Sequence, residues 1–347
     1  MLAPPWIPVP PPAYGGIEEV VRLLCDGLAA ARHDVTLFAP PGSHSAADVA
    51  PVLEEPHPDE IEKAKFEVDH VARAFAAIDA AAEEGRPYDV IHDHTGHSAL
   101  AMADRVGTPL VHTLHGPFDE AACRFYAQHG RKACIVAISQ AQLDDAPAEM
   151  GGGRVVPNPI EIGEWPFRAD KDDYALWIGR MSPDKGPHRA ITAAREAGVR
   201  LVLAGPVQPG QESFFASEVE PHLDGDGIEY VGEADGGAKR ALYQGARALL
   251  MPIRWPEPFG LVMVEALASG TPVIAFPEGS APEVVEDGRT GFVVDDEHAM
   301  AAAVARLGEI DPEDCRRSCE ERFSVAAVVR AYEDVYRDAA SVPAAGR

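Results

Sequence analysis

The chain has 347 residues, 46% of them apolar, which is enough for two domains with separate hydrophobic cores. Its formal net charge of −26 argues against a nucleic-acid partner or an anionic membrane surface, because both require basic patches. The five cysteines form no C-x-x-C pair, so we expect reduced thiols without a disulfide framework or a zinc site. No apolar run of about 18 residues or secretion signal is found, so we expect a cytoplasmic protein that does not associate with membranes.

The N-terminal stretch is rich in proline, which excludes a helix or a long central strand within residues 4–12. An amphipathic helix is predicted from about Ile17 to Arg32. Gly15 and Gly16 stand just before it, after Tyr14. Two adjacent glycines there let the backbone approach a phosphate or acceptor group at a helix N-terminus, although an ordinary turn explains them equally well.

The rest of the first half alternates between strands and helices, as expected for an α/β domain. We predict strands at 35–39, 89–94, 109–115, 133–138 and 154–159, a surface loop at 54–62 and a helix over 61–84.

Histidines gather at the ends of two of these strands. His92, Asp93, His94 and His97 could suggest a metal, but no cysteine or carboxylate pattern completes a ligand set. We favour a strand end that faces a ligand cleft, with Asp93 or His94 near the acceptor. His115 ends the next strand, and His112, an odd number of residues earlier, points to the opposite face.

The second half repeats the alternation after a linker expected at 160–172. We predict strands at 174–179, 199–204, 228–232, 248–252, 272–276 and 291–293, helices at 211–223, 239–246 and 323–337, and a disordered tail at 342–347. The turn after the first strand carries Arg180 and Lys185. A solvated surface turn would also explain these cations, but the chain has only six lysines.

The most informative stretch is WPEPFGLVMVEALASGTPV, residues 255–273. Its prolines hold Glu257 in a non-helical turn, and an apolar helix follows until Ser269. Glu265 shares a face of that helix with Leu261. The helix start beside Gly260 offers free N–H groups and the positive end of the helix dipole to an anion such as a diphosphate. Two acids beside such a helix end describe a sugar-nucleotide site, unless they merely face solvent.

The spacing of Glu257 and Glu265 resembles the Glu-x7-Glu signature of retaining glycosyltransferases of family 4. The resemblance implies an α/β GT-B fold, in which two Rossmann-like domains have parallel sheets that face an interdomain cleft. The acceptor-binding domain would span 1–160, the nucleotide-sugar-binding domain 173–322, and a helix at 323–340 would cross back to the first domain. Family members begin with a longer apolar strand, so either the start site is shortened or the first sheet tolerates a central stub.

The resemblance also implies roles for individual residues. Glu257 would contact the donor sugar and Glu265 the nucleotide ribose, while Arg180 and Lys185 would neutralise the diphosphate. His115 matches the family's histidine near the donor sugar. Backbone N–H groups would come from Phe259, Gly260 and Leu261, and Gly15 and Gly16 would form the opposite wall. These cations and the helix dipole remove the need for a metal or another cofactor.

The resemblance implies transfer of a sugar from a nucleoside diphosphate sugar to the hydroxyl of a small molecule or glycan, with retention at the anomeric carbon. Residues 1–160 hold 11 Lys and Arg against 23 Asp and Glu, which favours a soluble acceptor over a lipid. Two enzymatic alternatives share the fold: a sugar-nucleotide epimerase and a glycogen-phosphorylase-like enzyme. A third alternative is a catalytically weak or inactive nucleotide-sugar-binding protein.

Overall fold

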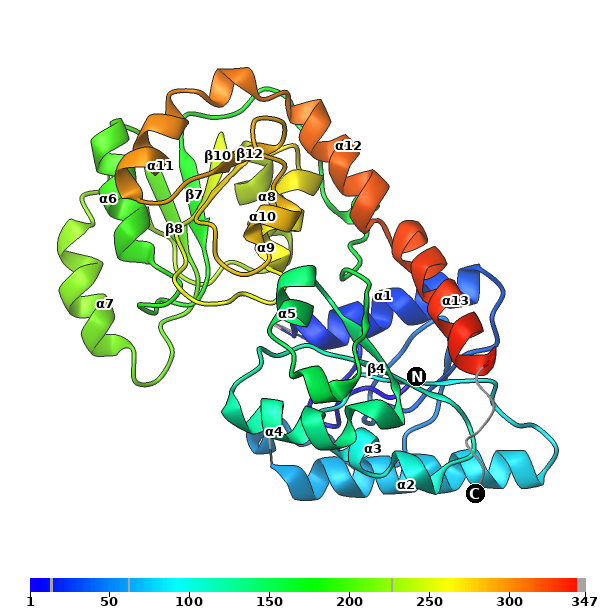
Figure 1. Cartoon of the computed structure of the whole chain (residues 1–347). Coiled ribbons are helices and arrows are strands. Elements are labelled where there is room, and N and C mark those ends of the chain that lie inside the picture. Colours follow the sequence, from blue (N-terminus) through cyan, green and yellow to red (C-terminus); the bar gives the residue numbers. More distant parts are fainter. Residues whose placement is uncertain (13–14, 62, 226, 342–347) are drawn as a thin grey trace. The chain divides into compact units, whose positions relative to one another are not determined.

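The computed structural model describes residues 1–12, 15–61, 63–225 and 227–341 (Figure 1). Contacts divide the described residues into two α/β units, one from Met1–Pro159 and Val325–Arg347, the other from Ile160–Ser324. Tyr14 and the tail at 342–347 lie outside the described residues, so the disorder expected of the tail stays a prediction. Within the described ranges, no helix combines the length and apolar character that a membrane span needs.

The sheet of the first unit is parallel, and the N-terminal residues lie inside it. Its order is β2 (Asp48–Val49), β1 (Thr36–Leu37), Leu2, β3 (Ile91–Asp93), β4 (Leu110–Thr113), β5 (Cys134–Ala137) and β6 (Arg154–Val155). Leu2 forms parallel bridges with Phe38 and Asp93, and its N–H donates to the carbonyl oxygen of His92 at 2.8 Å. Leu2 therefore connects β1 and β3 within one sheet.

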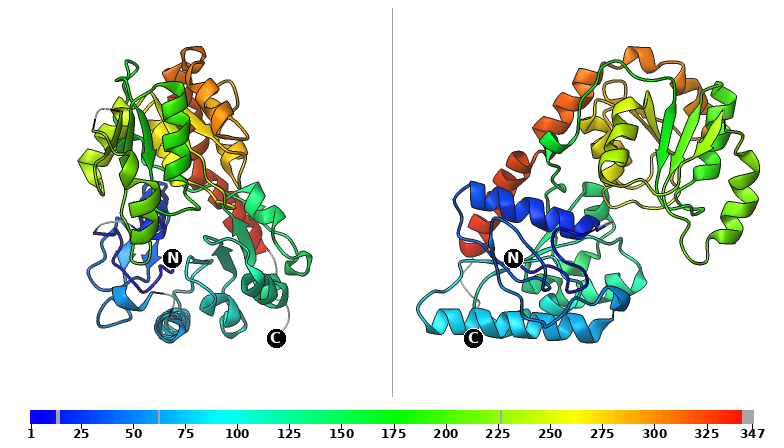
Figure 2. Two further views of the ribbon diagram at one scale, coloured as in Figure 1. Left: turned by 90° about the vertical axis from the view of Figure 1, so that its left-hand side faces the viewer. Right: turned by 180° about the vertical axis from the view of Figure 1, so that it is seen from behind.

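Helices cover both faces of this sheet. On one face lie α1 (Gly16–Ala30) and α13 (Val325–Ser341), and on the other lies α2 (Ala64–Glu83), as Figure 2 shows. Val20 of α1 and Val328 of α13 pack on Val111 of β4. The final helix thus belongs to the first unit, although more than 160 residues separate it from β6.

Several short helices of the first unit were not predicted. They are α3 (Ser98–Ala101) and α4 (Glu120–His129), with 3-10 turns at Pro58–Glu60, Ala103–Arg105, Gly130–Lys132 and Ala148–Met150. A further short helix, α5 (Gln140–Asp144), follows the helix N-cap signal of Ser139, whose hydroxyl oxygen accepts from the N–H of Gln142 at 3.0 Å. In α4 only Tyr126 is buried, and Ala122 and Phe125 are partly buried beside it, so the apolar stripe is too short to show where the helix begins. Its start is instead fixed by Asp119, whose carboxylate accepts from the N–H of Ala122 at 2.7 Å.

The sheet of the second unit is also parallel, and its strand order reverses direction once. The order is β12 (Gly291–Val293), β11 (Val273–Ala275), β10 (Ala248–Met251), β7 (Ala175–Ile178), β8 (Leu201–Ala204) and β9 (Ile228–Tyr230). The chain runs outward from β7 to β9, then returns to place β10 beside β7 and runs the other way. Open α/β sheets bind ligands at the carboxyl ends of the two strands flanking such a switch point.

Helices flank this sheet on both sides (Figure 1). One side carries α6 (Pro187–Ala197), α7 (Glu212–Glu218) and α11 (Glu297–Val304), and the other carries α8 (Gly236–Gly245), α9 (Leu261–Ala268), α10 (Ala281–Val284) and α12 (Pro312–Phe323). Three 3-10 turns lie at Ile162–Glu164, Glu220–His222 and Leu307–Glu309.

The stretch 160–172, expected to be a linker, is part of the second unit. Its Lys171 ammonium donates to the carbonyl oxygen of Ser269 and to Oγ1 of Thr271, both at 2.9 Å. Burial lowers the pKa of Lys171 to about 8. The second unit therefore begins at Ile160 rather than at 173, because a charged run that looks solvated in sequence is anchored by its lysine.

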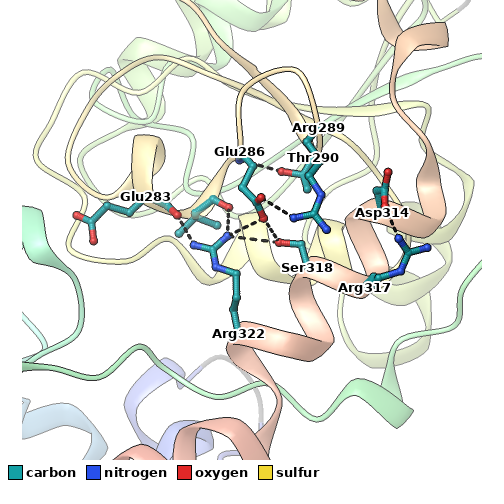
Figure 3. A network of polar contacts seen from close by, with 9 residues as sticks. Glu283, Glu286, Arg289, Thr290, Asp314, Arg317, Ser318 and Arg322 are labelled. Atoms are coloured by element: carbon teal, nitrogen blue, oxygen red, sulfur yellow. Dashed lines mark hydrogen bonds and ion pairs between the residues drawn. The ribbon is translucent and has the colours of Figure 1, made fainter.

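A polar network fastens α12 to the loops around α10 (Figure 3). The Glu286 carboxylate accepts from Ser318 Oγ at 2.5 Å and from Arg289 at 2.7 Å, and Arg322 donates to the carbonyl oxygen of Val284 at 3.1 Å. The bond from Ser318 is the main reason that the pKa of Glu286 lies below its usual value. The network holds in place the end of α10 and the segment that leads from it into β12.

We expect the substitution His70→Met to protect the protein against acid. His70 is fully buried in α2, and burial lowers its pKa to about 4. Between about pH 6.5 and 4, His70 is protonated in the unfolded chain but stays neutral in the folded protein. The free energy of unfolding of the wild type therefore falls as the pH drops. Methionine fills a similar space without titrating.

Thermal unfolding measured from pH 7 to 4 tests this expectation. The advantage of His70→Met should grow toward about 2–4 kcal/mol at pH 4, whereas Ile78→Met, at a buried residue of the same helix that carries no titratable group, should give a pH-independent difference. A constant difference for His70→Met across this range would contradict the expectation.

Candidate functional site

The candidate site of the second unit is built on two loops at its switch point. Loop 179–186 follows β7 and carries Arg180 and Lys185, while loop 252–260 follows β10 and carries Glu257. Leu249 of β10 pairs with Leu176 of β7, so both loops leave the same edge of the sheet. Parallel pairing therefore brings together charged residues that are far apart in sequence.

Lys185, Glu257 and Trp255 form one cluster. The Lys185 ammonium lies 2.5 Å from Oε2 of Glu257, and these side chains are only 18% and 15% exposed. The indole Nε1–H of Trp255 donates to the same carboxylate oxygen at 3.1 Å. The ammonium also lies 4.3 Å from the centroid of the Trp255 ring, within the range of a cation–π contact.

The backbone of Glu257 is held by the loop after β11. Ser280 donates its N–H to the carbonyl oxygen of Glu257 at 3.0 Å and its hydroxyl to the carbonyl oxygen of Phe259 at 2.7 Å. Gly279 has φ +54°, and a Cβ there would lie 2.3 Å from the Glu257 carbonyl oxygen. Only glycine allows these two loops to pack so closely.

Helix α9 begins directly after the Glu257 loop. Gly260 is its N-cap and has φ 74°, a left-handed conformation that favours glycine. The N–H groups of Leu261 and Val262 have no acceptor within the helix, whereas that of Met263 donates to the carbonyl oxygen of Gly260 at 2.9 Å. Phe259 is 3% exposed, so its contribution to a ligand site would come from its backbone.

Glu265 lies one turn inside α9 and is almost completely buried. Its carboxylate accepts from the Lys239 ammonium at 2.6 Å and from the Tyr243 hydroxyl at 2.8 Å. Burial raises the pKa of Tyr243 well above its usual value, so the hydroxyl is a donor at neutral pH. A carboxylate has about four lone-pair positions, so Glu265 can still accept two further hydroxyls.

Lys239 and Tyr243 were not predicted to be site residues. They are four residues apart in α8 and therefore share a helix face, which was a detectable signal. That this face meets Glu265 is visible only in the folded chain.

Arg180 is exposed and loosely held. Its guanidinium lies 3.4 Å from Oε1 of Gln208 and 4.0 Å from the Asp184 carboxylate. Both contacts are long, so the side chain can reorient toward an anion at little cost.

The remaining predicted site residues lie in the first unit. Gly15 is the N-cap of α1, and Gly16 is the first residue of that helix. A Cβ on Gly15 would lie 2.6 Å from Cβ of Pro11 and 2.9 Å from Ile7. Close packing against the proline-rich loop therefore accounts for Gly15, and a binding role for the pair stays a prediction.

His115 follows β4 and is half-buried. Its Nε2 lies 2.9 Å from Nδ1 of His94, and the two rings are stacked. Burial lowers the pKa of His115 to about 3, so its imidazole is neutral at physiological pH. His112 has other partners, Asp93 at 2.5 Å and Tyr126 at 2.9 Å.

The other histidines at this strand end are used in packing. His92 contacts the hydroxyls of Tyr336 and Thr113 at 2.7 and 2.8 Å. Among the residues that the structure describes, no three His, Cys, Asp or Glu side chains are arranged to hold a metal ion.

These observations define the class of the protein. Two α/β units with parallel sheets, one carrying cations and acids at its switch point, have the architecture of GT-B glycosyltransferases. Residues 163–322 match the family model "Glycosyl transferases group 1", and residues 14–164 match "Glycosyltransferase Family 4". The chain belongs to family 4 of the glycosyltransferases and is a transferase enzyme.

Individual relatives agree with this family. The chain is 28% identical to a glycogen synthase of Mycobacterium tuberculosis over 85% of its own length and 83% of the relative's. Its structure resembles AviGT4, a glycosyltransferase of avilamycin A biosynthesis, with TM-score 0.72, 26% identity and coverage of 98% and 97%. It also resembles the Anabaena protein HepE in complex with UDP, with TM-score 0.72, 20% identity and coverage of 93% and 96%, a likeness of fold.

We expect Tyr243→Phe to destabilise the second unit by about 1.5–3 kcal/mol, because it removes a buried hydrogen bond to the Glu265 carboxylate. Tyr174→Phe is a matched control, since the Tyr174 hydroxyl donates to the neutral carbonyl of Leu242, and its loss should cost only about 0.5–1.5 kcal/mol. Denaturant unfolding gives both values. Equal losses would show that the Tyr243 bond is not charge-assisted.

Proposed function

We propose that the enzyme transfers a sugar from a nucleoside diphosphate sugar to a hydroxyl acceptor with retention of anomeric configuration. The observation that carries the proposal is the arrangement at the switch point of the second unit. There Lys185 contacts Glu257, and α9 follows with Glu265 one turn inside it. This set matches the charges of such a donor, which combines a diphosphate with two groups of hydroxyls.

Each donor group has a matching partner. The guanidinium of Arg180 can donate two hydrogen bonds to phosphate oxygens, and the Lys185 ammonium supplies a compact positive charge. The N–H groups at the start of α9 can donate to the same diphosphate. Glu257 accepts from the sugar hydroxyls, and Glu265 from the ribose. Lys239 and Tyr243 hold Glu265 in place for that role.

In the proposed reaction the bond between the anomeric carbon and the diphosphate oxygen breaks, and its electron pair leaves with the diphosphate. The acceptor oxygen bonds to the same face of that carbon, and its proton passes to the departing phosphate oxygen. The positive groups of the site stabilise the charge that develops there without a metal or another cofactor. His115, as a neutral imidazole, would act as a hydrogen-bond partner of the sugar rather than as an acid.

The first unit would supply the acceptor side, with Gly15 and Gly16 at its wall. The named relatives include a glycogen synthase and an enzyme of avilamycin A biosynthesis, so we propose a small-molecule or glycan acceptor rather than a lipid. UDP is the first donor nucleotide to test, because the HepE structure contains it. All five cysteines are unpaired, in keeping with a reducing compartment such as the cytoplasm.

A thermal-shift screen with UDP, GDP, ADP and TDP tests donor binding. One of them should raise the unfolding temperature, because a ligand bound only by the folded state stabilises it by about 2.7 kcal/mol at one hundred times its Kd. The matching sugar donor, supplied with an acceptor panel, should give a glycoside with the anomeric configuration of the donor. An inverted product would reject retention, and binding without transfer or donor hydrolysis would favour a non-catalytic binding protein.

The two acids should respond differently to substitution. Glu257→Ala should lower turnover at least tenfold but leave affinity for the free nucleoside diphosphate equal or higher, because Lys185 is released from its partner. Glu265→Ala should weaken nucleoside diphosphate binding about tenfold or more, because the ribose loses its acceptor.

Calorimetric titration and initial rates separate the two effects. The exposed Glu309, which pairs only with the surface residue Arg306 in the described chain, is a matched control whose alanine variant should change neither quantity. Parallel loss of binding and turnover in Glu257→Ala would rule out its role in positioning the sugar.

A further inference from the structure

Trp255 contacts both Lys185 and Glu257, the two charged residues of the proposed donor site. Its Nε1–H bonds to Oε2 of Glu257 at 3.1 Å, and its ring lies 4.3 Å from the Lys185 ammonium. The Glu257 N–H donates to the Trp255 carbonyl oxygen at 2.8 Å, which closes a tight turn. The turn is set by local sequence, since Pro256 and Pro258 flank Glu257.

The two partners of Glu257 Oε2 would behave differently when a donor binds. On the proposed function, Lys185 turns from the carboxylate to the diphosphate, so Glu257 loses its cation. The indole N–H belongs to the same turn as Glu257 and, unlike the ammonium, is not attracted as a charge to the diphosphate. It would remain on Oε2 and leave Oε1 for a sugar hydroxyl.

Plain packing does not explain this arrangement. A half-buried aromatic residue that merely filled space would be served equally well by a phenyl ring. Here the single polar atom of the indole is directed at a carboxylate, and the apolar face is directed at an ammonium. Both orientations match the electrostatics of the ring, which has a positive edge and a negative face.

We propose that Trp255 is a positioning residue of the donor site: its N–H fixes the Glu257 carboxylate for the sugar, and its ring face holds Lys185 ready for the diphosphate. This inference rests on the proposed function and extends it to a residue outside the Glu-x7-Glu pattern. It predicts that the two contacts of one side chain affect two different kinetic quantities.

Two variants separate the contacts. Trp255→Phe keeps an aromatic face but loses the N–H, so kcat should fall about tenfold to a hundredfold while the Kd of UDP, or of whichever nucleoside diphosphate binds, stays within about twofold. Trp255→Leu loses both contacts, so kcat should fall similarly and that Kd should rise about twofold to fivefold. Phe167→Leu, an exposed aromatic change in the same unit, should alter neither quantity.

A double-mutant cycle tests whether Trp255 acts through Glu257. In a Glu257→Ala background, Trp255→Phe should produce no further loss of turnover, because the carboxylate that it positions is gone. Additive losses would overturn the inference, as would Trp255→Phe turnover equal to wild type. Unfolding temperatures of the ligand-free variants distinguish these results from misfolding.

The two proposals fail in different ways. A wild-type chain that neither binds nucleoside diphosphates nor transfers sugar would overturn the proposed function and this inference together. An active wild type whose Trp255→Phe variant is unchanged, or shows parallel loss of kcat and nucleotide affinity, would overturn this inference alone.

Discussion

The contact between Lys185 and Glu257 depends on one topological constraint. The two residues are 72 positions apart, and they meet because the chain returns from β9 to place β10 beside β7. Parallel pairing then aligns the carboxyl ends of both strands, so each following loop is delivered to the same edge. The sequence of either loop by itself contains a charged turn. The strand order of the sheet brings the two loops together, so that the Lys185 ammonium and the Glu257 carboxylate are close enough to form an ion pair.

The sequence revealed those parts of the site that one segment determines. Glu257, Gly260 and Glu265 follow from a single stretch, because prolines, a glycine and an apolar helix fix their spacing locally. The contact of Glu265 with Lys239 and Tyr243 could not be predicted, because the face that these two residues share meets α9 only after folding. Helix α4 was not predicted because its apolar stripe is short: beside the buried Tyr126, Ala122 and Phe125 are only partly buried.

The first unit shows the same division at His115. Its place at the end of a strand follows from the sequence, and so does the different direction of His112. The charge state of His115 does not follow from the sequence, because its pKa of about 3 results from burial. Its contact with His94 could not be predicted either, because the two residues follow different strands. Pairing of β3 with β4 brings these strand ends together, as the register of Asp93 with His112 shows. A histidine near a substrate suggests acid–base chemistry in sequence, whereas this environment favours a neutral hydrogen-bonding group.

The pairing of Lys185 with Glu257 bears on which ligands the site would favour on the proposed function. Both side chains are mostly buried, so separating them leaves two poorly solvated charges that each need a new partner. On the proposed function, a ligand with phosphates but no sugar would satisfy Lys185 and leave Glu257 without its cation. A free sugar would bond to Glu257 while Lys185 has no anion to approach. On the proposed function, a sugar nucleotide satisfies both charges at once, so the ion pair itself would select for the complete donor over its fragments.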